Sequence, residues 1–129
     1  MHIVVDFDGT CVTHDFPMIG KDIGAVPVLQ KLVSNGHKLI LFTMRSDNAA
    51  NKFLTEAVQR FADNNITLFG VQTNPTQKHW TSSPKAYGEI IIDDAALGCP
   101  LDYNSALSSR EFVDRKKVDE MLTDRLHLK

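Results

Sequence analysis

The sequence lacks the features that mark disulfide-stabilised, secreted or membrane-spanning proteins. Its 129 residues include only two cysteines, Cys11 and Cys99, too few for a disulfide framework and without the spacing of a metal site. No apolar run is long enough to cross a bilayer, and the short segment from Met1 to Asp6 does not resemble a signal peptide. We therefore expect a cytoplasmic protein with reduced cysteines and no membrane association.

The chain also lacks a strong excess of charge of either sign. Lysine and arginine number 14 and the acidic residues 16, so the formal net charge is -2. This balance argues against a general binding surface for nucleic acids or membranes and leaves open a local basic patch. There is no internal repeat or low-complexity segment, and the length suits one domain over residues 1–129 with a single core.

Two kinds of apolar pattern alternate along the sequence. Short, β-branched or continuous apolar runs predict strands over residues 2–5, 38–43, 68–71 and 89–93. Apolar residues at helical spacing predict helices over 25–35, over 48–63 with Ser46 or Asp47 as the cap, and after Ser108 or Ser109. Residues 74–84 are polar and predict a loop. The alternation predicts an α/β fold, a three-layer, Rossmann-like doubly wound sandwich whose mainly parallel sheet has helices on both faces.

Three of the predicted strands end in polar residues, namely Asp6, Thr43 and Asp93. In sheets of this kind, ligands bind beyond the carboxyl ends of the strands. The polar residues therefore lie where a functional site is expected.

The segment Asp6-Phe7-Asp8-Gly9-Thr10 is the most informative part of the sequence. In extended chain, Asp6 and Asp8 point to the same side while Phe7 points into the core. Two adjacent carboxylates repel each other, so such a pair favours a bridging cation or a division of chemical roles. Gly9 allows the sharp turn that presents both groups.

This segment resembles the first motif of the haloacid dehalogenase-like phosphatase superfamily, and the other three motifs follow in order. The strand that ends at Thr43 resembles the second, a lysine (Lys85, with Lys78 as the competing candidate) the third, and the acidic pair at 93–94 the fourth. The resemblance covers residues 6–94. The intervals between the motifs are too short for an inserted cap domain, so the chain resembles a capless member.

The resemblance implies a magnesium-dependent phosphatase that hydrolyses phosphate monoesters. Asp6 would be the nucleophile that forms an aspartyl-phosphate, and Asp8 the general acid and base. Mg²⁺ would be held by Asp6, by Asp93 and by Asp8 through its backbone carbonyl, with Asp94 in a water-mediated or outer contact.

The resemblance also implies residues that contact the substrate. The Thr43 hydroxyl and the backbone N–H of Met44 would donate hydrogen bonds to the phosphoryl group, and Lys85 would neutralise its charge. Arg45 would reach a second anionic or polar part of the substrate. His14 and His79, in nearby loops, are expected to be incidental.

An open, capless site implies a phosphorylated substrate that is either a small molecule or a macromolecule. Nucleic acid is expected only as a substrate, for example a phosphorylated polynucleotide end. The apolar segment 16–19 is a candidate contact surface for a homo-oligomer.

Three other functions remain open. A receiver module also phosphorylates an aspartate, but its acidic pair precedes the phosphorylated strand, whereas here the adjacent pair comes last. A non-catalytic module of the same fold is the second alternative. Phosphoryl transfer to an acceptor other than water is the third, because the same aspartyl-phosphate serves both reactions.

Overall fold

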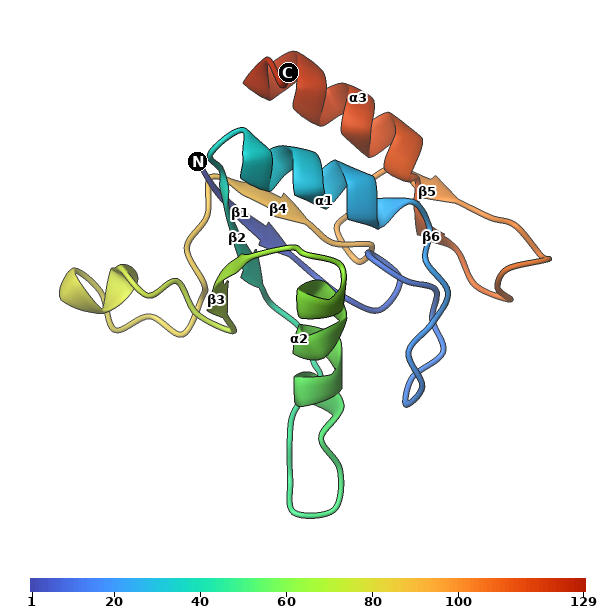
Figure 1. The fold of residues 1–129 in the computed structure, drawn as a ribbon, viewed down its shortest axis with the longest axis horizontal. Helices are drawn as coiled ribbons and strands as arrows, with labels where there is room; N and C mark the ends of the chain where they lie inside the picture. Colours follow the sequence, from blue (N-terminus) through green and yellow to red (C-terminus); the bar gives the residue numbers. More distant parts are fainter.

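Four parallel strands form the central sheet of the protein. The computed structural model describes all 129 residues, Met1 to Lys129, and the strand order is β3-β2-β1-β4 (Figure 1). The elements have these bounds: β1 His2–Val5, α1 Ala25–Ser34, β2 Lys38–Leu41, α2 Phe53–Asp63, β3 Leu68–Val71, the 3-10 helix η1 Gln77–His79, β4 Ile90–Ile92, β5 Leu101–Asp102, β6 Phe112–Val113 and α3 Arg115–Leu126. The predicted α/β class and parallel sheet are confirmed.

One face of the sheet packs against all three helices. The main core is a cluster of 18 buried apolar residues, to which the strands and helices both contribute. Its strand members include Ile3 and Val5 of β1 and Leu39 and Leu41 of β2, and its helix members come from α1, α2 and α3. Lys31 of α1 also forms an ion pair with Asp119 of α3 at 2.6 Å, which joins two helices that lie side by side in Figure 1.

The opposite face of the sheet is covered by irregular chain. Val4 and Ile40 point to this face, where they pack against Ala86 and the partly buried Phe69. The covering segment, residues 72–89, contains only the single turn η1, whereas helices were predicted on both faces. Its many turn-forming residues and lack of an apolar stripe explain why no α-helix forms there. The three layers are therefore helices, sheet and irregular chain, and no cap domain is present.

Helix α2 begins at Phe53, so the predicted start at residue 48 is wrong. The side chain of Asn48 accepts hydrogen bonds from the backbone N–H groups of Ala50 and Asn51, each at 2.9 Å. Such a local turn competes with helical hydrogen bonding and delays the helix. Asp47 does bind the first turn, because its carboxylate accepts from the backbone N–H of Thr55 at 3.0 Å, but it lies outside the helix.

The last helix, α3, begins at Arg115 rather than after Ser108 or Ser109. Its cap is Asp114, which accepts a hydrogen bond from the backbone N–H of Lys117 at 3.0 Å. The residues just before it, Phe112–Val113, instead form β6, which pairs with β5 in an antiparallel ribbon. Strand formation fits a β-branched and aromatic pair better than the first turn of a helix does.

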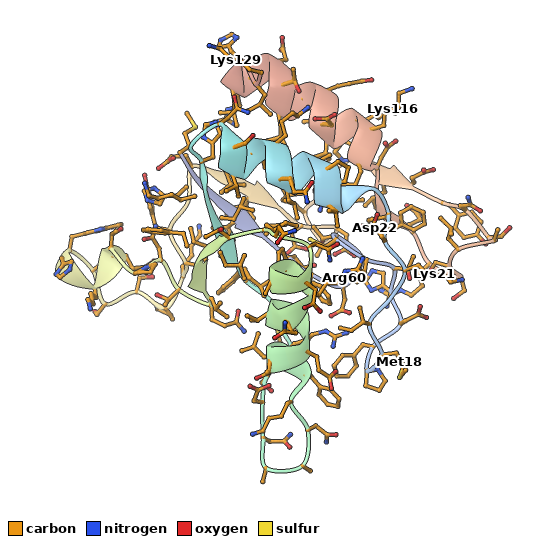
Figure 2. All side chains as sticks on the ribbon, in the orientation of Figure 1. Met18, Lys21, Asp22, Arg60, Lys116 and Lys129 are labelled. Atoms are coloured by element: carbon orange, nitrogen blue, oxygen red, sulfur yellow. The ribbon has the colours of Figure 1, made fainter.

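A loop of residues 13–21 projects from the end of the sheet, with Met18 at its tip (Figure 2). Its base is closed because the Thr13 N–H donates to the Lys21 carbonyl and the Lys21 N–H donates to the Thr13 hydroxyl, each at 2.9 Å. Asp22, just beyond, lies 3.7 Å from Arg60 of α2. The base of this loop is thus fixed to the body of the protein.

The predicted strands over 68–71 and 2–5 are confirmed, and those over 38–43 and 89–93 are shorter by two residues each. No helix of the protein combines the length and the apolar character needed to span a lipid bilayer.

Candidate functional site

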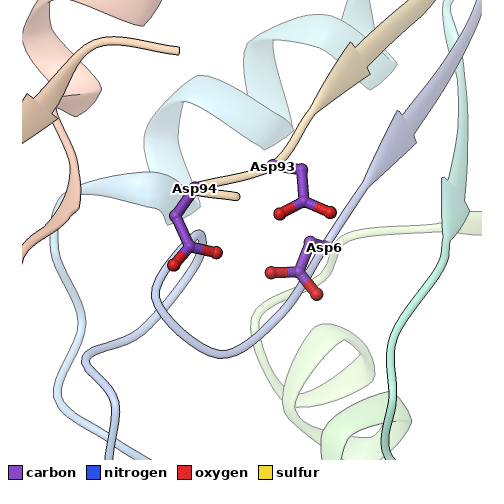
Figure 3. Close-up of side chains that lie close together, drawn as sticks. All are labelled: Asp6, Asp93 and Asp94. Carbon is purple, nitrogen blue, oxygen red and sulfur yellow. The ribbon is translucent and has the colours of Figure 1, made fainter. Parts of the chain in front are cut away.

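Asp6, Asp93 and Asp94 lie together at the carboxyl ends of β1 and β4. These strands are neighbours in the sheet, and Val5 pairs with Ile92, so the residue that follows each strand lies beside the other. One carboxylate oxygen from each of the three residues lies within 4.8 Å of the others (Figure 3). All three side chains are partly buried. The juxtaposition expected from the first and fourth motifs is present.

The three carboxylates of this cluster repel one another. Burial, and then the neighbouring charge of Asp93, raises the pKa of Asp6 to about 7, although hydrogen bonds from the Phe7 backbone and the Thr10 side chain lower it. No lysine or arginine forms an ion pair with any of the three carboxylates. Hard oxygen ligands at this separation suit Mg²⁺, and a cation would relieve the repulsion. The residues present therefore fit the implied metal.

Without a cation, the protein is expected to lose stability as the pH rises. The folded state holds the Asp6 proton up to a pKa of about 7, whereas the unfolded chain releases it near 3.8. Between these values the folded state binds more protons, so the free energy of unfolding falls as the pH increases. We therefore expect the melting temperature of the native protein, measured in EDTA, to fall relative to that of Asp6→Asn as the pH rises from about 4 to about 8.

Magnesium should reverse this loss. Because it binds ionised carboxylates, its stabilisation in thermal unfolding should be larger at about pH 8 than at about pH 5. A native protein whose stability relative to Asp6→Asn does not fall with pH in EDTA would contradict the assigned electrostatics.

The turn that follows β1 holds Asp6 in place through Thr10. The Thr10 hydroxyl lies 2.9 Å from Asp6 Oδ2 and 3.2 Å from Asp94 Oδ1, and it accepts a hydrogen bond from the Asp94 N–H at 3.1 Å. Gly9 has φ +80°, and a Cβ there would lie 2.6 Å from Asp94 Oδ2. Thr10 belongs to the first motif, yet its bridging position between the two aspartates was not foreseen from the sequence.

Arg115 supports the same turn from behind. Its side chain is 4% exposed, its Nε donates to the Thr10 carbonyl at 2.8 Å, and its Nη2 contacts that same oxygen. Nη1 is buried without a hydrogen-bond partner. Helix α3, which carries none of the four motifs, therefore contributes a buried charge that anchors the candidate site.

Asp8 forms a bidentate ion pair with Arg45. Arg45 Nε and Nη2 donate to Asp8 Oδ2 and Oδ1, each at 2.8 Å. The guanidinium also donates to the Met18 carbonyl at 2.8 Å and lies over the Phe7 and Phe16 rings. Arg45 is only 2% exposed. The predicted substrate-binding guanidinium is thus engaged inside the protein, where it occupies one acceptor site on each oxygen of Asp8.

Thr43 and Met44 follow β2, beside the acidic cluster's strand β1. The Thr43 N–H donates to Gln72 Oε1 at 2.8 Å, and the Gln72 amide donates back to the Thr43 carbonyl at 2.7 Å. The Thr43 hydroxyl accepts from the Arg45 N–H, which leaves its own proton able to donate. The Met44 side chain is 97% exposed. Gln72, whose φ is +65°, shapes this loop but has no sequence signal that marks it.

Lys85 is not brought into contact with the acidic cluster. Its side chain is exposed, forms no ion pair, and lines a cavity of about 310 Å³ with Trp80, Tyr87 and Ile91. Tyr87, two residues further on, packs against His2, at the opposite end of β1 from Asp6. The Gln77 side chain fixes this path, because it donates to the Lys85 carbonyl at 2.9 Å. The competing lysine, Lys78, lies in η1 and forms no ion pair either.

His14 contacts the cluster, whereas sequence reasoning treated it as incidental. Its Nε2 lies 2.8 Å from Asp94 Oδ2. His79, by contrast, is exposed and has no hydrogen bond or ion pair with the acidic residues. A lone histidine in a loop gives no signal from which this contact could be predicted.

Comparison with known proteins supports the fold and identifies no function. No family model matches the chain, and no curated protein matches it. It is similar to a solved structure of a conserved protein from Bacteroides thetaiotaomicron, with a TM-score of 0.76 and 28% sequence identity over 97% of this chain and 91% of that chain. The chain thus shares nearly its whole architecture with that bacterial protein.

Proposed function

We propose that the chain is a Mg²⁺-dependent phosphate-monoester hydrolase that works through an aspartyl-phosphate on Asp6. The observation that supports this most is the acidic cluster: three carboxylates that follow two adjacent strands converge at the carboxyl edge of a parallel sheet, and no lysine or arginine forms an ion pair with them. Aspartates so placed suit a nucleophile and the ligands of a divalent cation.

In this proposal, Asp6 attacks phosphorus and the bond to the ester oxygen breaks. Asp8 gives a proton to the departing alcohol and later takes one from the water that cleaves the aspartyl-phosphate. Thr10 keeps the Asp6 carboxylate in one orientation through its 2.9 Å hydrogen bond. Asp6, Asp93 and Asp94 would hold Mg²⁺, which would supply charge neutralisation for the phosphoryl group.

The phosphoryl group would also need hydrogen-bond donors from the protein. The Thr43 hydroxyl retains a proton for this purpose, and the Met44 N–H is the other predicted donor. The Arg45 guanidinium acts in this scheme through Asp8, because the pair already uses both carboxylate oxygens. Lys85 lines a cavity with Ile91 on the face of the sheet opposite the helices, so we assign it no step in the reaction. Its contact with the phosphoryl group remains a prediction from the sequence.

Release of inorganic phosphate from p-nitrophenyl phosphate and from a panel of phosphate esters tests the proposal. We expect turnover in Mg²⁺ and none in EDTA, with activity restored when Mg²⁺ is added back. Asp124→Asn, a change on the exposed face of α3, is the matched control and should keep full activity. A folded protein that binds Mg²⁺ but releases no phosphate from any ester would favour the non-catalytic alternative.

A further inference from the structure

We infer that His14 is a positioning residue that holds Asp94 in the orientation needed to bind a divalent cation; this rests on the metal site of the proposed function. Asp94 lies two residues beyond the end of β4, outside the residues that pair with β1. Something else must therefore fix the carboxylate, and the structure offers two candidates, Thr10 and His14.

Thr10 serves both aspartates and cannot hold Asp94 alone. Its hydroxyl has a single proton, which lies between Asp6 Oδ2 at 2.9 Å and Asp94 Oδ1 at 3.2 Å. The shorter distance favours Asp6. His14 has no second carboxylate partner, so its hydrogen bond to Asp94 Oδ2 at 2.8 Å is the one devoted to that residue. An ionised carboxylate only accepts, and therefore His14 Nε2 is the donor.

The surroundings of His14 are built to keep this hydrogen bond. The ring packs directly over Gly9, where a Cβ would lie 2.0 Å from His14 Nε2, so only glycine leaves room for the imidazole. The side chains of His14 and Asp94 are 15% and 17% exposed, which excludes most of the competing water. His14 follows Thr13, whose paired hydrogen bonds to Lys21 close the base of the 13–21 loop.

A hydrogen-bond donor that orients a metal-binding carboxylate raises the affinity of the site for the cation. Groups outside the ligand shell that hold ligands in place typically change metal affinity by about 10-fold or more when removed. His14 leaves Asp94 Oδ1 turned toward the shared Thr10 hydroxyl and Asp6, on the side where the three carboxylates converge. Loss of the imidazole would free the Asp94 carboxylate to rotate toward solvent.

The test is direct binding of Mn²⁺, which takes the same oxygen ligands as Mg²⁺, followed by electron paramagnetic resonance without any phosphate ester. We expect His14→Ala and His14→Asn to weaken binding by about 10-fold or more. His14→Gln should bind close to the native protein, because its amide nitrogen lies the same number of bonds from Cα as the imidazole Nε2. The asparagine side chain is polar but too short to reach Asp94. His79→Ala, on the exposed turn η1, is the matched control and should bind Mn²⁺ as the native protein does.

Melting temperatures in EDTA establish that each variant is folded. Equal Mn²⁺ affinity in native protein and His14→Asn, or equal weakening in the folded Gln and Asn variants, would overturn the inference, as would absence of Mn²⁺ binding by the native protein. Mn²⁺ binding that depends on His14 in a protein without phosphatase activity would uphold it while the hydrolase proposal fails. Phosphate release by a protein whose Mn²⁺ affinity does not change when His14 is replaced would support the hydrolase proposal and overturn the inference about His14.

Discussion

Asp6→Asn is expected to lower kcat for phosphate release by at least about a thousandfold, the scale on which removal of a covalent nucleophile acts. The amide cannot attack phosphorus and is a poor ligand for Mg²⁺. It does preserve the shape of the side chain and an oxygen that accepts from the Thr10 hydroxyl, so the turn should stay intact. The substitution therefore removes chemistry rather than structure.

Two measurements separate the nucleophile from a purely electrostatic role. Acid quenching during turnover, followed by mass spectrometry of peptides, should find a phosphate adduct on Asp6 in the native protein and none in Asp6→Asn. Asp124→Asn, with the same change of carboxylate to amide, should match the native protein in both. Residual activity in Asp6→Asn above about a tenth of native would show that Asp6 does not form the covalent intermediate.

Arg45→Met is expected to lower the free energy of unfolding by about 3 kcal/mol, the typical cost of breaking a buried ion pair by removal of one partner. It would leave Asp8, whose side chain is 19% exposed, without its bidentate partner. The Met18 carbonyl would also lose a donor. Arg45→Lys should recover little of this, because an ammonium group cannot reproduce the bidentate geometry.

Urea unfolding of a double-mutant cycle with Asp8→Asn measures this pair directly. Removing Arg45 should cost less in the Asp8→Asn background, with a coupling free energy of about 1 kcal/mol or more. The control is Lys31→Met, which breaks the half-exposed pair with Asp119 and should cost less than about 1 kcal/mol. An Arg45→Met protein no less stable than Lys31→Met would contradict the structural importance of this pair.

Local sequence signals predicted the sheet and the acidic cluster. The short β-branched runs that end at Asp6 and Asp93 favour strands, and the parallel pairing of these strands brings the residues that follow them together. Helix α1 was equally predictable, because an apolar stripe is followed by Gly36, whose φ of +84° stops the helix. In each case the sequence signal lies within a few residues, although the pairing of the strands is long-range.

The errors came from interactions that the local pattern does not contain. Asn48 turns back on its own backbone and delays α2, and Asp114 takes the capping role expected of Ser108 or Ser109. The path of Lys85 is set by Gln77, and the orientation of Asp94 by His14, 80 residues away. The turn at Asn48 and the cap at Asp114 are local hydrogen bonds that the apolar pattern does not register. The contacts of Gln77 and His14 depend on the tertiary fold, so residue type and spacing do not reveal them.

The anchoring of Thr10 by Arg115 has a consequence for synthesis of the chain. The two residues are 105 positions apart, so the ribosome makes the turn that holds Asp6 long before it makes the guanidinium behind that turn. Contacts between distant segments form late, because the intervening chain must first be ordered. A nascent chain that has not yet reached α3 therefore contains every acidic residue of the cluster but not its support, and the site matures only after α3 has been synthesised.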